Sequence, residues 1–303
     1  MKGDSVNKIV TDKIIDMIET GKLNDWHKAF KRIKRNIDAK KNYSALNQLL
    51  LCGDTSEYYI TPKKAIEKHL NFKGAKKQLV TFWKVTPTTR IDPKTNENVH
   101  GNMFMLRYYE VIGFDSIADD EVKAKLLAKK SEYKNNVKDF NLDALIKKVN
   151  AEIKTGQSGE AYYSLSRHYV SMPKIETFDD TASYYKTLFH ELVHWTGHKS
   201  ILDRHDTKGF EFVEDHKEKY SKEELVAEIG SAMLSEYFNM NDSVDSLKNS
   251  ASYIKHWVSK LKDDHNMIVQ ASGKADKAVN YILTKMGLIE TEKEESGEMT
   301  ETA

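Results

Sequence analysis

Hydrophobic positions recur with two different spacings along the chain, and the change of spacing divides it into a mixed first part and a more helical second part. In the first part, apolar residues three or four positions apart predict a helix over 6–20, which ends at Gly21. Two more helices are predicted, one over 43–51 and one that begins at 61–66 with a proline in its first turn. Short helices therefore dominate the beginning of the chain.

A β-hairpin is predicted next. Residues 79–85 and 103–111 are rich in β-branched and aromatic side chains, and 92–96 supply the turn between them. Together with the preceding helices, this hairpin predicts a small α+β domain that ends near Ile117.

The second part begins with a charged segment, 118–150, whose apolar positions have helical spacing. A short aromatic strand is predicted over 161–170, and long helices follow over 183–197, 221–238, 249–266 and 271–286. The predicted fold class is α+β, with a small α+β domain followed by a mainly helical one. The predicted boundaries are a first domain at 1–117, a helical linker region at 118–150, a second domain at 151–289, and a disordered acidic tail at 290–303.

Composition adds two expectations, one about where the protein is located and one about how its charge is distributed. The 303 residues contain one cysteine, Cys52, and no run of 18 apolar residues, and the first residues lead into no apolar secretion signal. We therefore expect a soluble cytoplasmic protein with no membrane partner. Residues 28–41 are strongly basic although the net charge of the whole chain is only +1.

The strongest chemical signal is His190-Glu191-Leu192-Val193-His194. Residues four apart share one face of a helix, so His190 and His194 can bind one ion, and Glu191 can take a proton from water and deliver it to a leaving amine. The alternative is a helix with two surface histidines. The apolar residues around the motif argue against it, because a buried histidine pair needs partners.

A catalytic zinc site has three protein ligands, so a third ligand is expected downstream. In the astacin-like spacing Gly197 fits, but the last position is Ser200, which does not replace histidine. In the thermolysin-like spacing a second helix supplies a glutamate, and Glu224 and Glu228, one turn apart, match this pattern. We prefer Glu224 as the ligand, and we expect Glu228 and His198 to contact the ligands rather than the ion. Either glutamate could reach the ion, and the ordinary alternative for this pair is a solvated helix face.

The chemistry implied is hydrolysis of an amide in an unknown protein or peptide, because a zinc ion polarises a carbonyl and makes water a better nucleophile. Histidine and carboxylate ligands also suit manganese. The sequence does not assign the group that stabilises the oxyanion.

Two segments carry a resemblance to a known family. TLFHELVHWTGH at 187–198 and EELVAEIGSA at 223–232 resemble the zincin-like domain of the ArdC antirestriction family, and 253–257 and 274–278 are similar to its C-terminal helices. The first half, through 11–15, 42–47 and 107–111, is similar to the single-stranded-DNA-binding domain of that family. The resemblance implies a protein of a bacterial phage or plasmid that acts in antirestriction.

Single-stranded DNA is held by basic side chains along its phosphates and by aromatic rings stacked on its bases. Both kinds of residue are present, although each aromatic can instead be a core residue and the charged run a solvated face. The candidates are Lys31, Arg32, Lys34, Arg35, Lys40, Lys41, Trp26, Tyr43, Trp83 and Tyr108.

The leading hypothesis is a single-stranded-DNA-binding antirestriction protein with a zinc metallopeptidase-like domain. Two alternatives stay open at this point. In one, the protein protects DNA and its metal domain is structural. In the other, the protein is a regulatory metalloprotease that cleaves a repressor and does not touch DNA.

Overall fold

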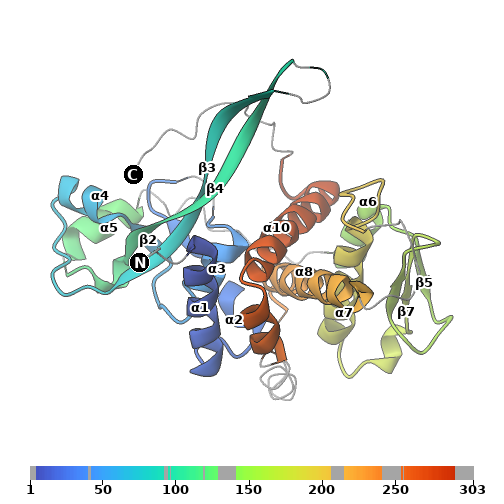
Figure 1. Cartoon of the computed structure of the whole chain (residues 1–303). Coiled ribbons are helices and arrows are strands. Elements are labelled where there is room, and N and C mark those ends of the chain that lie inside the picture. The colour runs from blue at the N-terminus through green and yellow to red at the C-terminus, as the bar shows by residue number, and fades with distance from the viewer. Residues whose placement is uncertain are drawn as a thin grey trace.

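The computed structural model combines helices with two separate sheets (Figure 1). It describes residues 5–39, 42–91, 95, 97–118, 120–128, 141–205, 215–240, 254 and 256–290. The helices are α1 (Val6–Glu19), α2 (Trp26–Phe30), α3 (Ala45–Leu50), α4 (Pro62–Glu67), α5 (Asp120–Ala128), α6 (Leu142–Val149), α7 (Thr181–Thr196), α8 (Asp215–Tyr237) and α10 (Met267–Met286). The strands are β1 (Arg35–Asn36), β2 (Tyr58–Ile60), β3 (Lys77–Ile91), β4 (Asn98–Gly113), β5 (Ile153–Thr155), β6 (Tyr162–Ser164) and β7 (Tyr169–Met172).

The first sheet has the order β1-β2-β4-β3, and only the β1–β2 pair is parallel. Strands β3 and β4 stay paired from Lys77 and Ile112 to Ile91 and Asn98, so the hairpin extends far beyond the body of the molecule as a two-stranded arm (Figure 1). The predicted hairpin is confirmed, but it is longer than predicted. Its outer half is exposed on both faces, so no alternation of apolar and polar residues marks it in the sequence.

A buried asparagine anchors the root of the arm. The side-chain amide of Asn47 in α3 donates to the backbone oxygen of Thr81 at 2.8 Å, and its oxygen accepts from the backbone nitrogen of Thr81 at 2.7 Å. Asn47 thus pairs with β3 as a neighbouring strand would. Because both groups are buried and both are satisfied, the contact fixes where the arm leaves the body.

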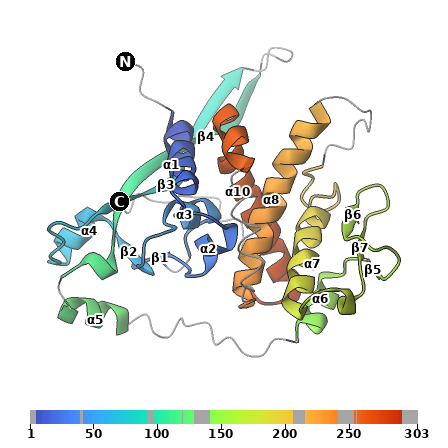
Figure 2. The same cartoon turned by 90° about the horizontal axis from the view of Figure 1, so that it is seen from below.

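The second sheet has the order β5-β7-β6 and lies outside α7, while α7, α8 and α10 lie side by side (Figure 2). The single strand predicted over 161–170 is wrong in detail, because β6 and β7 form a hairpin that turns at His168, whose φ is 52°. The three residues of β5 are too few to show a period in the sequence. The predicted helices over 183–197, 221–238 and 271–286 are present as α7, α8 and α10.

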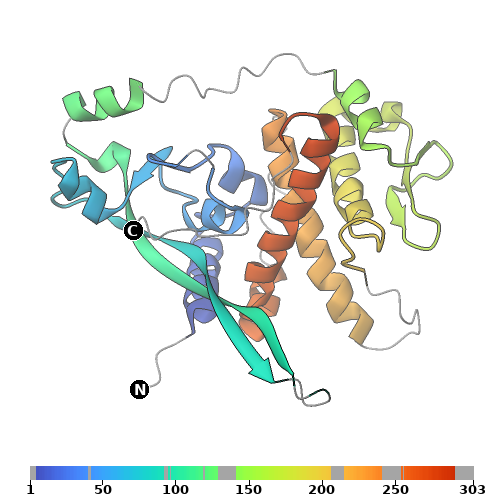
Figure 3. The same cartoon turned by 90° about the horizontal axis from the view of Figure 1, so that it is seen from above.

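One hydrophobic core joins residues from both halves of the chain. Helix α10 packs against α1 and α3 as well as α8, and α2 packs against α8. Helix α5 packs with the first sheet, whereas α6 packs with α10, and Figure 3 shows these two helices at opposite ends of the molecule. Because this core includes residues of both predicted domains, the domain boundaries at 117 and 151 remain a prediction. Most of the predicted acidic tail, 291–303, lies outside the described residues. Among the described helices none is long and apolar enough to cross a bilayer.

A carboxyl group from the end of the chain caps a helix near its beginning. Ser44 forms no side-chain cap for α3, and both oxygens of Asp276 in α10 accept from the backbone nitrogen of Ala45, at 3.0 and 3.1 Å. Burial raises the pKa of Asp276 to about 7, because the hydrogen bond from Ala45 offsets only part of the cost of burying its charge.

We predict that this cap makes folding pH-dependent. Asp276 binds its proton more tightly in the folded chain, so its contribution to the free energy of unfolding is complete below pH about 4 and is lost as the pH rises to about 7. Asp276→Asn keeps an acceptor oxygen but cannot ionise, so the urea midpoint should fall less between pH 5 and pH 8. Asp12→Asn, at an exposed carboxyl, is the control, and an unchanged pH dependence in Asp276→Asn would contradict the prediction.

Candidate metal centre

Helix α7 carries the histidine motif and is fixed at its start and along its buried side. The carboxylate of Asp180 accepts from the backbone nitrogen of Ser183 at 2.7 Å, which satisfies one of the free N–H groups of the first turn. Leu188, Phe189 and Leu192 are almost fully buried in the shared core. The helix therefore has little freedom to turn about its axis, which fixes the direction of its histidines.

Helix α8 approaches α7 closely because it has a glycine at the contact. A Cβ atom placed on Gly230 would lie 2.8 Å from Cγ2 of Val193, closer than two carbon atoms can pack. The hydroxyl of Ser231 donates to the backbone oxygen of Lys186 at 3.0 Å and joins the two helices at a second point. These contacts bring Glu224, six residues before Gly230 in α8, to the histidines of α7.

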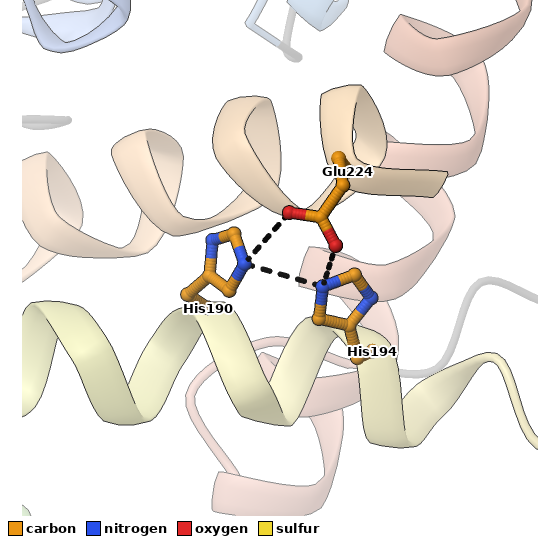
Figure 4. A group of neighbouring side chains, drawn as sticks. All are labelled: His190, His194 and Glu224. Carbon is orange, nitrogen blue, oxygen red and sulfur yellow. Dashed lines mark hydrogen bonds and ion pairs between the residues drawn. The ribbon is translucent and has the colours of Figure 1, made fainter. Parts of the chain in front are cut away.

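Three ligand atoms from the two helices converge on one point (Figure 4). Nε2 of His190 and Nε2 of His194 are 3.2 Å apart. One oxygen of Glu224 lies 3.5 Å from Nε2 of His190, and the other lies 3.2 Å from Nε2 of His194. Taking one ligand atom from each of the three residues, all the atoms lie within 4.8 Å of one another.

These separations fit a tetrahedral ion. Bonds of about 2.0 Å at tetrahedral angles place neighbouring ligand atoms about 3.3 Å apart. The two histidine nitrogens are 3.2 Å apart, close to that value, and each lies 3.2 or 3.5 Å from a different oxygen of Glu224, so the two imidazoles and this carboxylate can share one ion. An ion held by these three residues would keep a fourth position for water, as a catalytic site requires. Two imidazoles and a carboxylate suit zinc and manganese.

Glu191 lies beside this face and is poised to hold a proton. Its side chain is buried, and burial raises its pKa although the two neighbouring histidines oppose the shift. The backbone N–H of Tyr163, on strand β6, faces this carboxylate and also opposes the shift. A buried carboxyl group with a raised pKa can accept a proton and return it.

A carboxylate faces the outer ring nitrogen of each histidine. Oε1 of Glu228 lies 3.8 Å from Nδ1 of His190, and Oε1 of Glu223 lies 3.6 Å from Nδ1 of His194. The predicted Glu228 therefore faces His190, whereas sequence reasoning missed Glu223. Glu223 points about 100° around the helix from Glu224, so the i,i+4 spacing that selects Glu224 and Glu228 does not select it.

The structure places the predicted His198 elsewhere. Its ring stacks on His168, with centroids 3.7 Å apart, and its Nδ1 is 2.8 Å from the hydroxyl of Ser200. A role behind the ligands is therefore not retained for His198. Packing explains the glycine at position 197, because a Cβ atom there would overlap the ring of His205. Nε2 of that ring donates to the backbone oxygen of His194 at 2.8 Å.

The structure separates the predicted DNA-binding residues into exposed and buried groups. Trp26 is only 3% exposed and belongs to the core, and the ammonium of Lys34 is buried and donates to the backbone oxygens of Asp54 and Ser56. Neither can contact DNA, and these two predictions are not retained. Tyr43 is half-buried, with its ring against Tyr59.

The other candidates are more accessible. Lys31 and Arg32 are exposed, and Arg35 is half-buried with its Nε 3.8 Å from Glu57. Trp83 and Tyr108 are each 46% exposed, and both lie on the β3–β4 arm. Lys40 and Lys41 lie outside the described residues.

Comparison with known proteins covers both halves of the chain. Residues 140–274 match the family described as zincin-like metallopeptidase, and residues 4–112 match the N-terminal domain of the anti-restriction factor ArdC. The chain is 26% identical over 294 residues to the DNA primase TraC of Escherichia coli, which covers 90% of this chain and 26% of that protein. It is 28% identical over 292 residues to the uncharacterized protein y4eC of Sinorhizobium fredii, with 90% of each chain covered. The chain thus spans about a quarter of the length of the primase.

Two solved structures share the fold along nearly the whole chain. The metal-free crystal structure of the antirestriction ArdC protein from the R388 plasmid has a TM-score of 0.68 and 30% identity, and the match covers 95% of this chain and 100% of that one. The Mn(II)-bound structure of the same protein has a TM-score of 0.69 and 29% identity, with 93% and 98% covered. The chain therefore belongs to the ArdC family of antirestriction proteins.

Proposed function

We propose that this chain is a single-stranded-DNA-binding antirestriction protein whose second half is a metal-dependent peptidase. The observation that carries the peptidase half is the convergence of His190, His194 and Glu224 beside the buried Glu191. Two imidazoles and a carboxylate leave one position free, and a proton-accepting group stands next to it. This is the arrangement that hydrolysis of an amide needs.

The chemical roles follow from the geometry. A divalent ion held by His190, His194 and Glu224 would polarise a carbonyl and make water more acidic. Glu191 receives the proton of the attacking water and delivers it to the leaving amine, and its raised pKa keeps it competent for both steps. The zincin-like family supports zinc as the ion, and the Mn(II)-bound relative supports manganese.

The β3–β4 arm is the surface that supports DNA binding. Its register places Trp83, Val85, Phe104 and Tyr108 on one face, and Phe104 is 60% exposed. Lys84 and Arg107 lie on the opposite face and are also exposed. The two paired segments 82–91 and 98–107 contain no acidic residue.

An arm of this kind suits a single strand for a physical reason. A two-stranded ribbon is narrow, so a strand lying along its edge can stack its bases on the aromatic face while long basic side chains reach its phosphates. Trp83, Phe104 and Tyr108 are exposed aromatic rings, and exposed apolar side chains gathered in this way mark a binding surface. We therefore propose the arm, with Trp83 and Tyr108, as the principal DNA surface.

The assigned ligands predict how metal binding responds to substitution. His190→Ala, His194→Ala and Glu224→Ala should each abolish stoichiometric binding of Zn²⁺ or Mn²⁺, because two remaining ligands hold an ion weakly. Glu228→Gln should weaken binding by about 10- to 100-fold, since it contacts a ligand and not the ion. Calorimetric titration of both metals measures this, with Glu152→Gln as a surface control. Full binding by Glu224→Ala would contradict the assignment.

The proposed role of Glu191 predicts that its substitution affects catalysis and leaves metal binding intact. Glu191→Gln should bind the ion normally and slow peptide-bond hydrolysis by about 10²- to 10⁴-fold, because proton transfer is lost. The assays are cleavage of denatured casein and protection of an unmodified plasmid that enters a restricting host. If the variant binds metal and still protects the plasmid fully, the metal domain acts without catalysis in antirestriction.

The arm predicts which residues carry DNA affinity. Trp83→Ala with Tyr108→Ala should weaken binding of a 30-nucleotide oligothymidylate by at least about tenfold, because each stacked base contributes about 1–3 kcal/mol. Lys84→Ala with Arg107→Ala should reduce the salt dependence of binding instead. Fluorescence anisotropy measures both, with Tyr162→Ala, 40% exposed in the other half, as the matched control. Unchanged affinity in both double variants would point to a protein that acts without contacting DNA through the arm.

A further inference from the structure

The segment that follows α7 folds back under the end of the helix and places one arginine between α7 and α8. The backbone nitrogen of Arg204 donates to the backbone oxygen of Gly197 at 2.9 Å, which closes the loop. The side chain of Arg204 is only 5% exposed although it carries a full positive charge. A buried guanidinium is held in place only where its donors find acceptors.

Its donors bind both helices at once. On α7, one terminal nitrogen donates to the backbone oxygen of Val193 at 2.6 Å, and the other donates to the hydroxyl of Thr196 at 2.9 Å. On α8, two nitrogens of the same guanidinium contact the two oxygens of Glu223, at 2.8 and 3.3 Å. Such a two-point pair restricts the carboxylate in orientation as well as in position.

The carboxylate so fixed faces a metal ligand. Oε1 of Glu223 is the oxygen nearest to Nδ1 of His194, at 3.6 Å, while Nε2 of the same ring points to the ion position. Because Nε2 must be free of a proton to bind an ion, Nδ1 must carry the proton, and a carboxylate on that side favours this tautomer and ring orientation.

The structure thus assigns Arg204 as a positioning residue of the metal centre, which acts on the ion through Glu223 and His194. This inference rests on the proposed metal site and adds a residue that touches neither ion nor substrate. Lysine cannot replace it, because an ammonium group lacks the planar pair of donors that holds both oxygens of Glu223 and the end of α7 at the same time.

The test is metal affinity measured by calorimetry with Mn²⁺ and Zn²⁺, together with the visible absorption of the Co²⁺-loaded protein, which reports the geometry around the ion. Arg204→Met should weaken both metals by about 10- to 100-fold and alter the Co²⁺ spectrum. Arg204→Lys should give a similar loss. Glu223→Gln, which keeps an acceptor oxygen without the charge, should give a smaller loss in the same direction.

The matched control is Lys222→Met, which removes the 3.0 Å ion pair between α8 and Asp264 at the neighbouring position of the helix. Unfolding midpoints of the metal-free variants separate a local effect from a general loss of stability. Unchanged metal affinity in the folded Arg204→Lys and Glu223→Gln variants would overturn the proposal, as would an equal loss in Lys222→Met. Failure of the unmodified protein to bind any metal would instead reject the proposed metal site itself.

Discussion

The contact between α7 and α8 is the constraint on which the rest of the second half depends. Gly230 lets the backbone of α8 reach Val193, and only at that separation do Glu224 and the two histidines share one point. Arg204 acts at the end of the same contact, with donors to both helices. Helices held only by apolar packing can slide or rotate slightly, whereas a metal centre requires its ligand atoms within a few tenths of an ångström. The polar contacts restrict that remaining freedom.

The parts that could be predicted from the sequence are those whose information is local. The spacing of His190 and His194, the apolar positions of the long helices and the aromatic hairpin are each properties of a short segment. The family resemblance recognised in the two motifs was also correct. The features that could not be predicted depend on contacts between residues distant in sequence. Strands β1 and β2 form because each is hydrogen-bonded to a neighbouring strand, and Arg204 is buried because Glu223 of α8 accepts its hydrogen bonds. Trp26 and Lys34 show the same limit, since an aromatic or basic residue does not reveal which side of the surface it occupies.

Over the described residues, the shared core packs the two halves of the chain against each other. Helix α2 lies against α8, which carries Glu224, and α10 contacts α1, α3 and α8. The Asp276 cap adds a polar contact from α10 to the start of α3, and α3 in turn holds the root of the arm through Asn47. A continuous series of packed elements therefore connects the proposed DNA surface to the metal centre. Such continuity is the physical condition for coupling between two sites, although coupling itself is a property of binding energies.

The anchor at Asn47 also has a consequence for how such a protein can diversify. Asn47 contacts chiefly the backbone N–H and C=O of Thr81, and these groups are the same in every amino acid except proline. The outer part of the ribbon makes its ladder from backbone groups as well. The attachment is thus nearly independent of the side chains beyond it, and the arm can acquire new residues, or be exchanged for another hairpin, while its exit from the body stays the same. Substitutions in the outer ribbon therefore leave the contacts of this anchor unaltered.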